Sequence, residues 1–419
     1  MTNFEHIRGK YKMNKFEKLG IEGPLLERIK EETFDTPTEV QEKSIPLILE
    51  GKDIIAGSAT GSGKTLAFSA GIIQNSRKGR GIQAIVLTPT RELAEQVKDA
   101  MKHFSKYKQL MITAIYGGVS ISPQMDLLRK TDVVVGTPGR VLDHLSRGTL
   151  DLSKVKVAVL DEADRMLDMG FIDDVNRILS QCADVRQTLL FSATIPYDLE
   201  KLAKKHMKNP INISVEAYVD KSKLIQNFYQ VPNNMKFSLL VHLLKKETSS
   251  LVMVFCNTQR ETDFVANNLG KNGINAIPIH GGLTQAKRSR TLEIFNSGKS
   301  YVLVCTDVAA RGLHIDDVSH VYNYDLPTDS KQYIHRIGRT ARAGKEGKAI
   351  SLLSMRDHDN FNNVLRDKSL DIVEEPLPEF ERVVARRHEG NRDNFGRGGP
   401  RRPQQRRGGH RRQRDRRYQ

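Results

Sequence analysis

The chain has 419 residues, of which 38% are hydrophobic, and it carries a formal net charge of +16. This length gives room for two or three domains, and the composition is sufficient for packed cores. No apolar run approaches the ~20 residues that a membrane-spanning helix needs, and the N-terminus, with Glu5, His6, Arg8 and Lys10, lacks a signal-peptide core. We therefore expect a cytoplasmic protein with no membrane partner.

The three cysteines, Cys182, Cys256 and Cys305, lie far apart in the sequence. Metal ligation needs clustered spacing, and disulfide frameworks are typical of small secreted chains. We expect three buried free thiols.

Two helices are predicted after a polar N-terminal stretch, Met1 to Asn14. The first covers Phe16 to Glu32, where Pro24 suits a first helical turn and apolar residues recur with helical spacing at Leu19, Leu25, Leu26 and Ile29. The second follows Thr36-Pro37-Thr38 and carries Val40, Gln41, Ile45 and Ile48.

A predicted short strand, Asp53 to Gly57, leads into the octet Ser-Ala-Thr-Gly-Ser-Gly-Lys-Thr at residues 58 to 65. A glycine-rich turn between a strand and a helix points backbone N–H groups at a phosphate. Gly61 and Gly63 permit the close approach, Lys64 adds a charge on the terminal phosphates, and the Thr65 hydroxyl is placed to hold Mg²⁺. Ser58 stands where the Walker A pattern has its first glycine.

Short, nearly all-apolar runs alternate with helical stretches along the rest of the chain, as expected of strands buried on both faces of parallel sheets. In the first half they are Ala84 to Leu87, Thr113 to Tyr116, Asp132 to Val135, Val157 to Leu160 and Thr188 to Phe191. The second half repeats the plan with Leu251 to Phe255, Ala276 to Ile279, Tyr301 to Cys305, His320 to Tyr324 and Ala349 to Leu353.

Polar or glycine-bearing clusters follow these strands, and ligands of open α/β sheets bind beyond the carboxyl ends of strands. The clusters should therefore line one edge: Gly61 to Thr65, Pro89 to Glu92, Gly117-Gly118, Thr137 to Arg140, Asp161 to Asp164 and Ser192 to Thr194. Asp161 follows an apolar run, so its carboxylate should lie at a strand end opposite the phosphate loop, where Mg²⁺ needs an anionic ligand.

The pattern predicts an α/β protein with two parallel-sheet domains and a linker near Val219 to Ser222. The boundaries that we expect are an N-terminal extension over 1–13, a first domain over 14–215, a linker over 216–223, a second domain over 224–380 and a tail over 381–419.

The C-terminal tail carries most of the positive charge. Residues 382 to 419 contain 14 Arg against Glu389, Asp393 and Asp415, which gives a net charge of +11 out of the total of +16. The tail has too few apolar residues for their burial to offset the entropy lost on ordering. We therefore expect the tail to be disordered. The tail has two interpretations, an RNA-binding anchor or a charged extension that aids solubility.

Taken together, these clusters closely resemble the DEAD-box family of superfamily 2 RNA helicases, from Phe16 to about Leu353. The residues that carry the resemblance are Phe16 with Gln41, residues 58 to 65, Pro89-Thr90-Arg91-Glu92-Leu93-Ala94, Gly117-Gly118, Thr137-Pro138-Gly139-Arg140, Asp161-Glu162-Ala163-Asp164, Ser192-Ala193-Thr194, Val254-Phe255, Gln285 with Arg288, Thr306-Asp307 to Arg311-Gly312, and His335 to Arg342. The resemblance implies two tandem RecA-like domains with a disordered basic tail.

For nucleotide chemistry, the resemblance implies ATP and Mg²⁺ as cofactors. Glu162 would orient and deprotonate the attacking water, and Arg339 and Arg342 would be arginine fingers delivered from the second domain. The implied catalytic residues are Lys64, Asp161, Glu162, Arg339 and Arg342, with Thr65 and Asp161 at the metal. The implied ATP-binding residues are Phe16, Gln41, Ser58, Ala59, Thr60, Gly61, Ser62, Gly63, Lys64, Thr65 and Asp307. The amide of Gln41 can match adenine N6 and N7 but not guanine, which predicts a preference for ATP.

For RNA, the resemblance implies sequence-independent contacts to phosphates and sugars. The implied RNA-binding residues are Pro89, Thr90, Arg91, Gly118, Thr137, Gly139, Arg140, Gln285, Arg288 and Thr306. Ser192, Thr194 and His335 would couple hydrolysis to strand separation. The activity that the resemblance implies is RNA-stimulated ATP hydrolysis that unwinds short duplexes or remodels ribonucleoprotein. We expect a monomer, with RNA and ribonucleoprotein or ribosome-assembly components as partners.

Two departures and two alternatives accompany this reading. His314 replaces a usual acidic residue that is thought to touch the ribose. Either Asp316 takes this role or the sugar contact is weaker, and we favour the second. Ala341 replaces a usual glycine, which should only stiffen the turn. The sequence is also compatible with an ATP-gated RNA clamp or annealing chaperone, and less well with a DNA-stimulated translocase.

Overall fold

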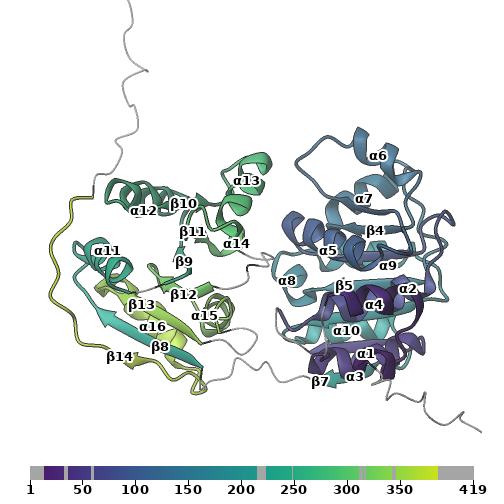
Figure 1. Cartoon of the computed structure of the whole chain (residues 1–419), viewed down its shortest axis with the longest axis horizontal. Coiled ribbons are helices and arrows are strands. Elements are labelled where there is room, and N and C mark those ends of the chain that lie inside the picture. Colours follow the sequence, from purple (N-terminus) through teal and green to yellow (C-terminus); the bar gives the residue numbers. More distant parts are fainter. Residues whose placement is uncertain are drawn as a thin grey trace, which may run out of the picture. The chain divides into compact units, whose positions relative to one another are not determined.

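The computed structural model describes residues 14–32, 36–57, 61–214, 223–247, 249–310, 315, 318–341 and 346–385. These residues form two seven-stranded sheets, each all-parallel, with helices between successive strands (Figure 1). The prediction of two RecA-like α/β domains is confirmed. The tail after residue 385, and the disorder expected of it, lie outside the described residues.

The first sheet has the strand order β3-β4-β2-β5-β6-β1-β7. Its elements are α1 (Lys15–Lys18), α2 (Gly23–Glu31), α3 (Glu39–Leu49), β1 (Ile54–Gly57), α4 (Lys64–Asn75), β2 (Ala84–Leu87), α5 (Arg91–Phe104), β3 (Ile112–Ile115), α6 (Ser122–Leu128), β4 (Val133–Gly136), α7 (Pro138–Ser146), β5 (Val157–Asp161), α8 (Ala163–Asp168), α9 (Ile172–Leu179), β6 (Gln187–Ser192), α10 (Tyr197–His206) and β7 (Ile211–Ser214).

The second sheet repeats this order as β10-β11-β9-β12-β13-β8-β14. Its elements are β8 (Leu224–Gln230), α11 (Lys236–Lys246), β9 (Leu251–Cys256), α12 (Gln259–Lys271), β10 (Ala276–Ile279), α13 (Gln285–Asn296), β11 (Val302–Thr306), α14 (Asp307–Ala310), β12 (Val318–Asn323), α15 (Ser330–Ile337), β13 (Gly347–Leu353), a 3₁₀ turn (Met355–Asp357), α16 (His358–Leu365) and β14 (Val373–Glu374).

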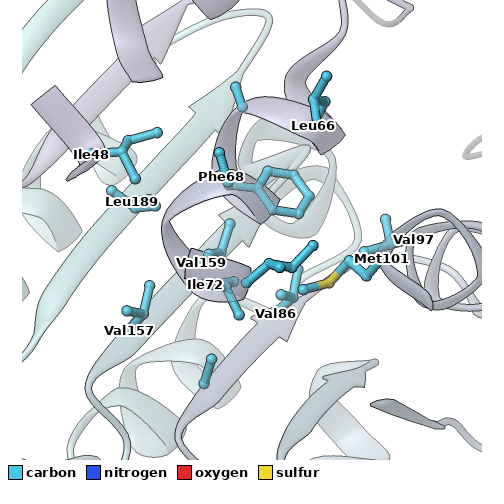
Figure 2. Packing of buried hydrophobic residues seen from close by; sticks show 14 of the residues in the cluster. Ile48, Leu66, Phe68, Ile72, Val86, Val97, Met101, Val157, Val159 and Leu189 are labelled. Carbon is cyan, nitrogen blue, oxygen red and sulfur yellow. The ribbon is translucent and has the colours of Figure 1, made fainter. Parts of the chain in front are cut away.

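The central strands are apolar along much of their length because both faces of the sheet are covered. In β5, Val157 and Val159 belong to one hydrophobic cluster, while Ala158 and Leu160 belong to the cluster on the opposite face. Figure 2 shows the first of these clusters, where Phe68 of α4 packs beside Val159 and Leu189. This packing fixes the position of α4, the helix that follows the phosphate loop, and therefore of Lys64 at its start.

The predicted helix over Phe16 to Glu32 is two helices. The chain leaves α1 at Leu19, and Gly20 takes a left-handed backbone with φ of +90°. Ile21 is then buried in the core, and Pro24 lies in the first turn of α2, as predicted. A turn that needs glycine therefore breaks a stretch with regular helical spacing.

Three strands were not predicted: β7, β8 and β14. In β7 only one of four residues is buried, and the two residues of β14 are exposed. The three cysteines are buried and free, as expected. Across the described residues, none of the helices has both the length and the hydropathy needed to cross a bilayer.

Candidate nucleotide and RNA site

Three neighbouring strands of the first sheet bring the predicted phosphate loop, acidic tetrad and hydroxyl motif together. β1 pairs with β6, which places Gly57 opposite Ser192, and β6 pairs with β5, which places Asp161 opposite Phe191. The phosphate loop follows Gly57, and Glu162 follows Asp161. The carboxyl ends of these strands therefore converge, as expected of an open parallel sheet.

Lys64 begins α4, and its ammonium lies 3.9 Å from Oδ1 of Asp161. Both side chains are buried. Burial raises the pKa of Asp161 to about 6, against the opposing charge of Lys64. Oδ1 of Asp161 is buried and accepts no hydrogen bond within the described part of the chain. A buried carboxylate oxygen without a donor is the kind of ligand that a hard cation satisfies.

Glu162 has a left-handed backbone, with φ of +53°, at the start of α8. Such a conformation costs of order 1–3 kcal/mol for a residue other than glycine and occurs most often at functional sites. Its Oε2 pairs with Nη1 of Arg165 at 3.0 Å, and both side chains are 4% exposed. Burial would raise the pKa of Glu162, but Arg165, Lys64 and Arg339 outweigh it and lower the pKa. Sequence reasoning missed Arg165, because its role depends on the backbone turn at Glu162.

The acidic tetrad is joined to the hydroxyl motif by Asp164. The Asp164 N–H donates to Oγ of Ser192 at 3.0 Å, and Thr194 donates to Oδ2 of Asp164 through its N–H and its hydroxyl, at 3.1 Å each. Burial would raise the pKa of Asp164, but Ser192 and Arg165 lower it. Two of the predicted coupling residues therefore lie within hydrogen-bond distance of the tetrad.

Gln41 connects α3 to the phosphate loop. Its Oε1 accepts the Thr38 N–H at 3.0 Å, and its Nε2 donates to the Gly63 carbonyl at 3.1 Å. Gly63 has φ of +90°, and a Cβ there would clash with the Gln41 amide. The amide keeps one more N–H and one more lone pair for a base.

Phe16, which the resemblance implies as an ATP-binding residue, is buried in the structure. Its side chain is 1% exposed and belongs to the hydrophobic core of the first sheet. In this structure Phe16 is a core aromatic, and its contact with ATP stays a prediction.

Most of the predicted RNA-binding residues line one groove of about 440 Å³. They are Pro89, Thr90, Arg91, Thr137, Gly139, Arg140, Gln285 and Arg288. Gly118 and Thr306 do not line the groove. Gly118 nevertheless lies against Arg91, which does: its φ is +78°, and the Arg91 guanidinium occupies the place that a Cβ would take. Thr90 also caps α5 by accepting the Leu93 N–H.

Glu92 lies in the same groove and was not among the predicted binding residues. It accepts a hydrogen bond from Nε2 of Gln285 and pairs with Nη2 of Arg288, both at 3.0 Å. An acidic side chain there competes with a phosphate for the same donors. The motif Thr90-Arg91-Glu92 contains this residue, but the motif by itself does not predict its pairing with Gln285 and Arg288.

Helix α15 and the residues after it hold the predicted residues His335 and Arg339. His335 lies in this helix, and burial, with Arg165 next, lowers its pKa to about 4. Arg339 follows the helix and is 3% exposed. Asp307, the first residue of α14, pairs with Arg336 at 2.6 Å.

Several predicted residues lie outside the described residues: Ser58, Ala59, Thr60, Arg342, His314 and Asp316. Ala341 is described and has φ of +55°. The expected stiffening at Ala341 therefore coincides with a left-handed backbone that glycine adopts more readily.

Two family models match this chain. The family model for DEAD/DEAH box helicases matches residues 38–202, and the model for the helicase conserved C-terminal domain matches residues 235–344. An ATP-dependent RNA helicase CshA from Listeria monocytogenes is 46% identical over 348 residues, which cover 82% of this chain and 67% of the relative. A DEAD-box ATP-dependent RNA helicase CshA from Bacillus cereus is 44% identical over 357 residues, which cover 84% of this chain and 68% of that relative.

Solved structures give the same picture. A structure of S. cerevisiae Dbp5 bound to RNA and ADP BeF3 has a TM-score of 0.79 and 34% identity, with 86% of this chain and 95% of that chain covered. A DEAD box protein from Methanococcus jannaschii has a TM-score of 0.54 and 42% identity, with 86% and 99% covered.

Proposed function

This chain belongs to the DEAD-box family of superfamily 2 RNA helicases, and from that premise we propose that it hydrolyses ATP when stimulated by RNA and thereby unwinds short RNA duplexes or remodels ribonucleoprotein. The observation that carries the proposal is the convergence of β1, β5 and β6, which sets the phosphate loop beside two buried carboxylates. We also propose that the protein is a monomer and that it acts in the cytoplasm.

The phosphate loop would hold the triphosphate through backbone N–H groups and Lys64. Thr65 and Asp161 would hold Mg²⁺, which supplies charge neutralisation on the phosphate oxygens. The buried Oδ1 of Asp161, which accepts no hydrogen bond within residues 14–385 as described, supports this assignment. On binding, the charge of the cation would bring the pKa of Asp161 down from about 6.

Glu162 would orient the attacking water and accept its proton. Its lowered pKa keeps it ionised at neutral pH, and its strained turn places the carboxylate at the end of β5. Arg339 and Arg342 would stabilise the charge that develops on the transferred phosphoryl group. Arg339 is buried and is one of the cations that lower the pKa of Glu162.

The groove that Arg91, Arg140 and Arg288 line would hold one RNA strand by phosphate and sugar contacts. Such contacts carry no base information, so binding would be largely independent of sequence. RNA would compete with Glu92 for Gln285 and Arg288. ATP and RNA would close the cleft together, strand bending would displace the partner strand, and phosphate release would reopen the enzyme.

The decisive test is ATP hydrolysis with RNA, with DNA of the same length and sequence, and with no nucleic acid. We expect stimulation by RNA well above that by DNA. Equal stimulation by DNA would point to a translocase. Unwinding of a short duplex, set against ATP-dependent retention of single-stranded RNA, separates the helicase from a clamp; retention without unwinding would contradict the helicase.

Nucleotide selection tests the role of Gln41. We expect the enzyme to prefer ATP over GTP by roughly 10- to 100-fold in kcat/KM, since a bidentate amide contact with adenine is worth about 1–3 kcal/mol. Gln41→Ala should bring the two nucleotides close together, whereas Glu42→Gln at the next, exposed position should not. Thermal unfolding of both variants controls for the lost cap of α3. Equal hydrolysis of ATP and GTP by the intact enzyme would refute this use of Gln41.

The basic tail would anchor the enzyme on RNA. Removing residues 386–419 should flatten the dependence of RNA binding on salt, because each phosphate contact contributes about −0.7 to the slope of log K against log salt for a single strand. ATP hydrolysis at saturating RNA should change little. Titrations from low to high salt measure the slope, and an unchanged slope would favour a tail that only aids solubility.

A further inference from the structure

Arg336 is a buried arginine at the end of α15 with every N–H group bonded. Its side chain is 1% exposed. Nε donates to Oδ1 of Asp307 at 2.7 Å, and Nη2 donates to Oδ2 of Asp307 at 2.6 Å. The remaining donors reach Oδ1 of Asn257 at 2.9 Å, the Asp325 carbonyl at 2.5 Å and Oδ1 of Asn323 at 3.3 Å. The five donors of a guanidinium are therefore all engaged within the protein.

These partners come from the ends of three neighbouring strands. Asn257 follows β9, Asp307 follows β11 and Asn323 ends β12, and the order β11-β9-β12 makes them adjacent in the sheet. The guanidinium also lies 5.2 Å from the ring centroid of Phe255, at the end of β9. One side chain therefore joins the last turn of α15 to the carboxyl ends of three interior strands.

The arrangement changes the expected role of Asp307. The sequence suggested an ATP contact, but both carboxylate oxygens of Asp307 face the guanidinium fork. A bidentate pair of this kind fixes orientation as well as distance. The backbone N–H of Arg339 donates to the backbone carbonyl of Arg336 at 3.2 Å. The backbone of the proposed arginine finger is therefore hydrogen-bonded to the residue that pairs with Asp307.

We propose that Arg336 and Asp307 form a positioning pair for hydrolysis, which holds α15 against the strand ends and thereby sets the backbone from which Arg339 projects. The pair touches neither nucleotide nor RNA. This inference rests on the proposed role of Arg339, and it assigns Asp307 to the support of that residue.

The test is a double-mutant cycle in the full chain, with Arg336→Gln, Asp307→Asn and the two combined. We expect each single variant to lower kcat of RNA-stimulated ATP hydrolysis by about 100-fold, the loss that a small misplacement of a catalytic group produces. The KM for ATP should stay within about threefold. The combined variant should be no worse than the poorer single variant, because the two residues act as a unit. Arg336→Lys, which keeps the charge but not the fork, should recover little.

Arg366→Gln removes an exposed arginine after α16 and serves as the matched control. Losses that multiply in the combined variant would overturn the inference. So would a rise of about tenfold or more in the KM for ATP in Asp307→Asn with kcat retained, since that result marks a nucleotide contact.

If a single variant fails to fold, the combined variant, which leaves no buried charge unpaired, supplies the test: normal thermal unfolding with lost kcat supports the pair, and wild-type kcat overturns it. Full activity of Arg339→Gln would instead contradict the proposed function, whatever the result for the pair.

Discussion

Glu162→Gln is expected to lower RNA-stimulated ATP hydrolysis by at least ~10²-fold, because a positioned general base contributes roughly that much or more. The amide has nearly the shape of the carboxylate but cannot take a proton from water. ATP binding should persist, since the phosphate loop and Lys64 are unchanged. Steady-state hydrolysis at saturating RNA, together with the affinity for a non-hydrolysable ATP analogue, measures both quantities.

Two features of the structure shape the controls for this variant. Glu162 pairs with buried Arg165, so its neutralisation leaves a buried cation without that partner and should lower thermal stability. Asp173→Asn, an exposed acid in the first turn of α9, removes a charge without this consequence. Retention of a tenth or more of the activity by a folded Glu162→Gln enzyme would contradict its assignment as the base.

Arg339→Gln is expected to reduce hydrolysis at saturating RNA by about 10³-fold, the lower end of what arginine fingers contribute in nucleotide hydrolases. The side chain is 3% exposed and lowers the pKa of Glu162. A guanidinium in so dry a place interacts with phosphoryl charge far more strongly than it would in water. Single-turnover hydrolysis, with ATP-analogue binding measured in parallel, isolates the chemical step.

The expected signature of Arg339→Gln is a loss in kcat with little change in nucleotide affinity, since the proposed triphosphate contacts belong to the first sheet. Arg339→Lys should recover only a minor part, because an ammonium cannot present a planar fork. Arg366→Gln again provides the exposed control. A loss that appeared only in the KM for ATP would show that Arg339 contributes uniform binding, not transition-state stabilisation.

The strands that the sequence predicts most easily are those that are apolar along their whole length. β2 and β10 are of this kind, and both were predicted with their observed bounds. β2 is buried at every position, whereas β10 is an edge strand in which three of the four residues are half-buried. The edge strands β7 and β14 carry no such pattern: in β7 three of four residues are exposed, and β14 has two residues. The break between α1 and α2 escaped notice because Gly20 interrupts an otherwise regular helical spacing.

Some contacts of the site could likewise be predicted from the sequence, and others could not. Ser192, Asp164 and Thr194 meet because each ends or follows a strand of one parallel sheet, which residue order alone could anticipate. The pairing of Glu92 with Arg288 could not be anticipated. It depends on which elements pack together, and a single sequence does not state this.

By itself, the sequence determined that parallel α/β sheets present a phosphate loop, an acidic strand end and a set of arginines, because loops, strand ends and their polar residues are local features. Only the tertiary structure decided which charges neutralise one another. Asp307 and Arg336 are 29 residues apart and belong to different elements, yet a low-dielectric interior requires each buried charge to find a partner. That requirement is met by the packing of α15 on the sheet, and no local pattern reveals it.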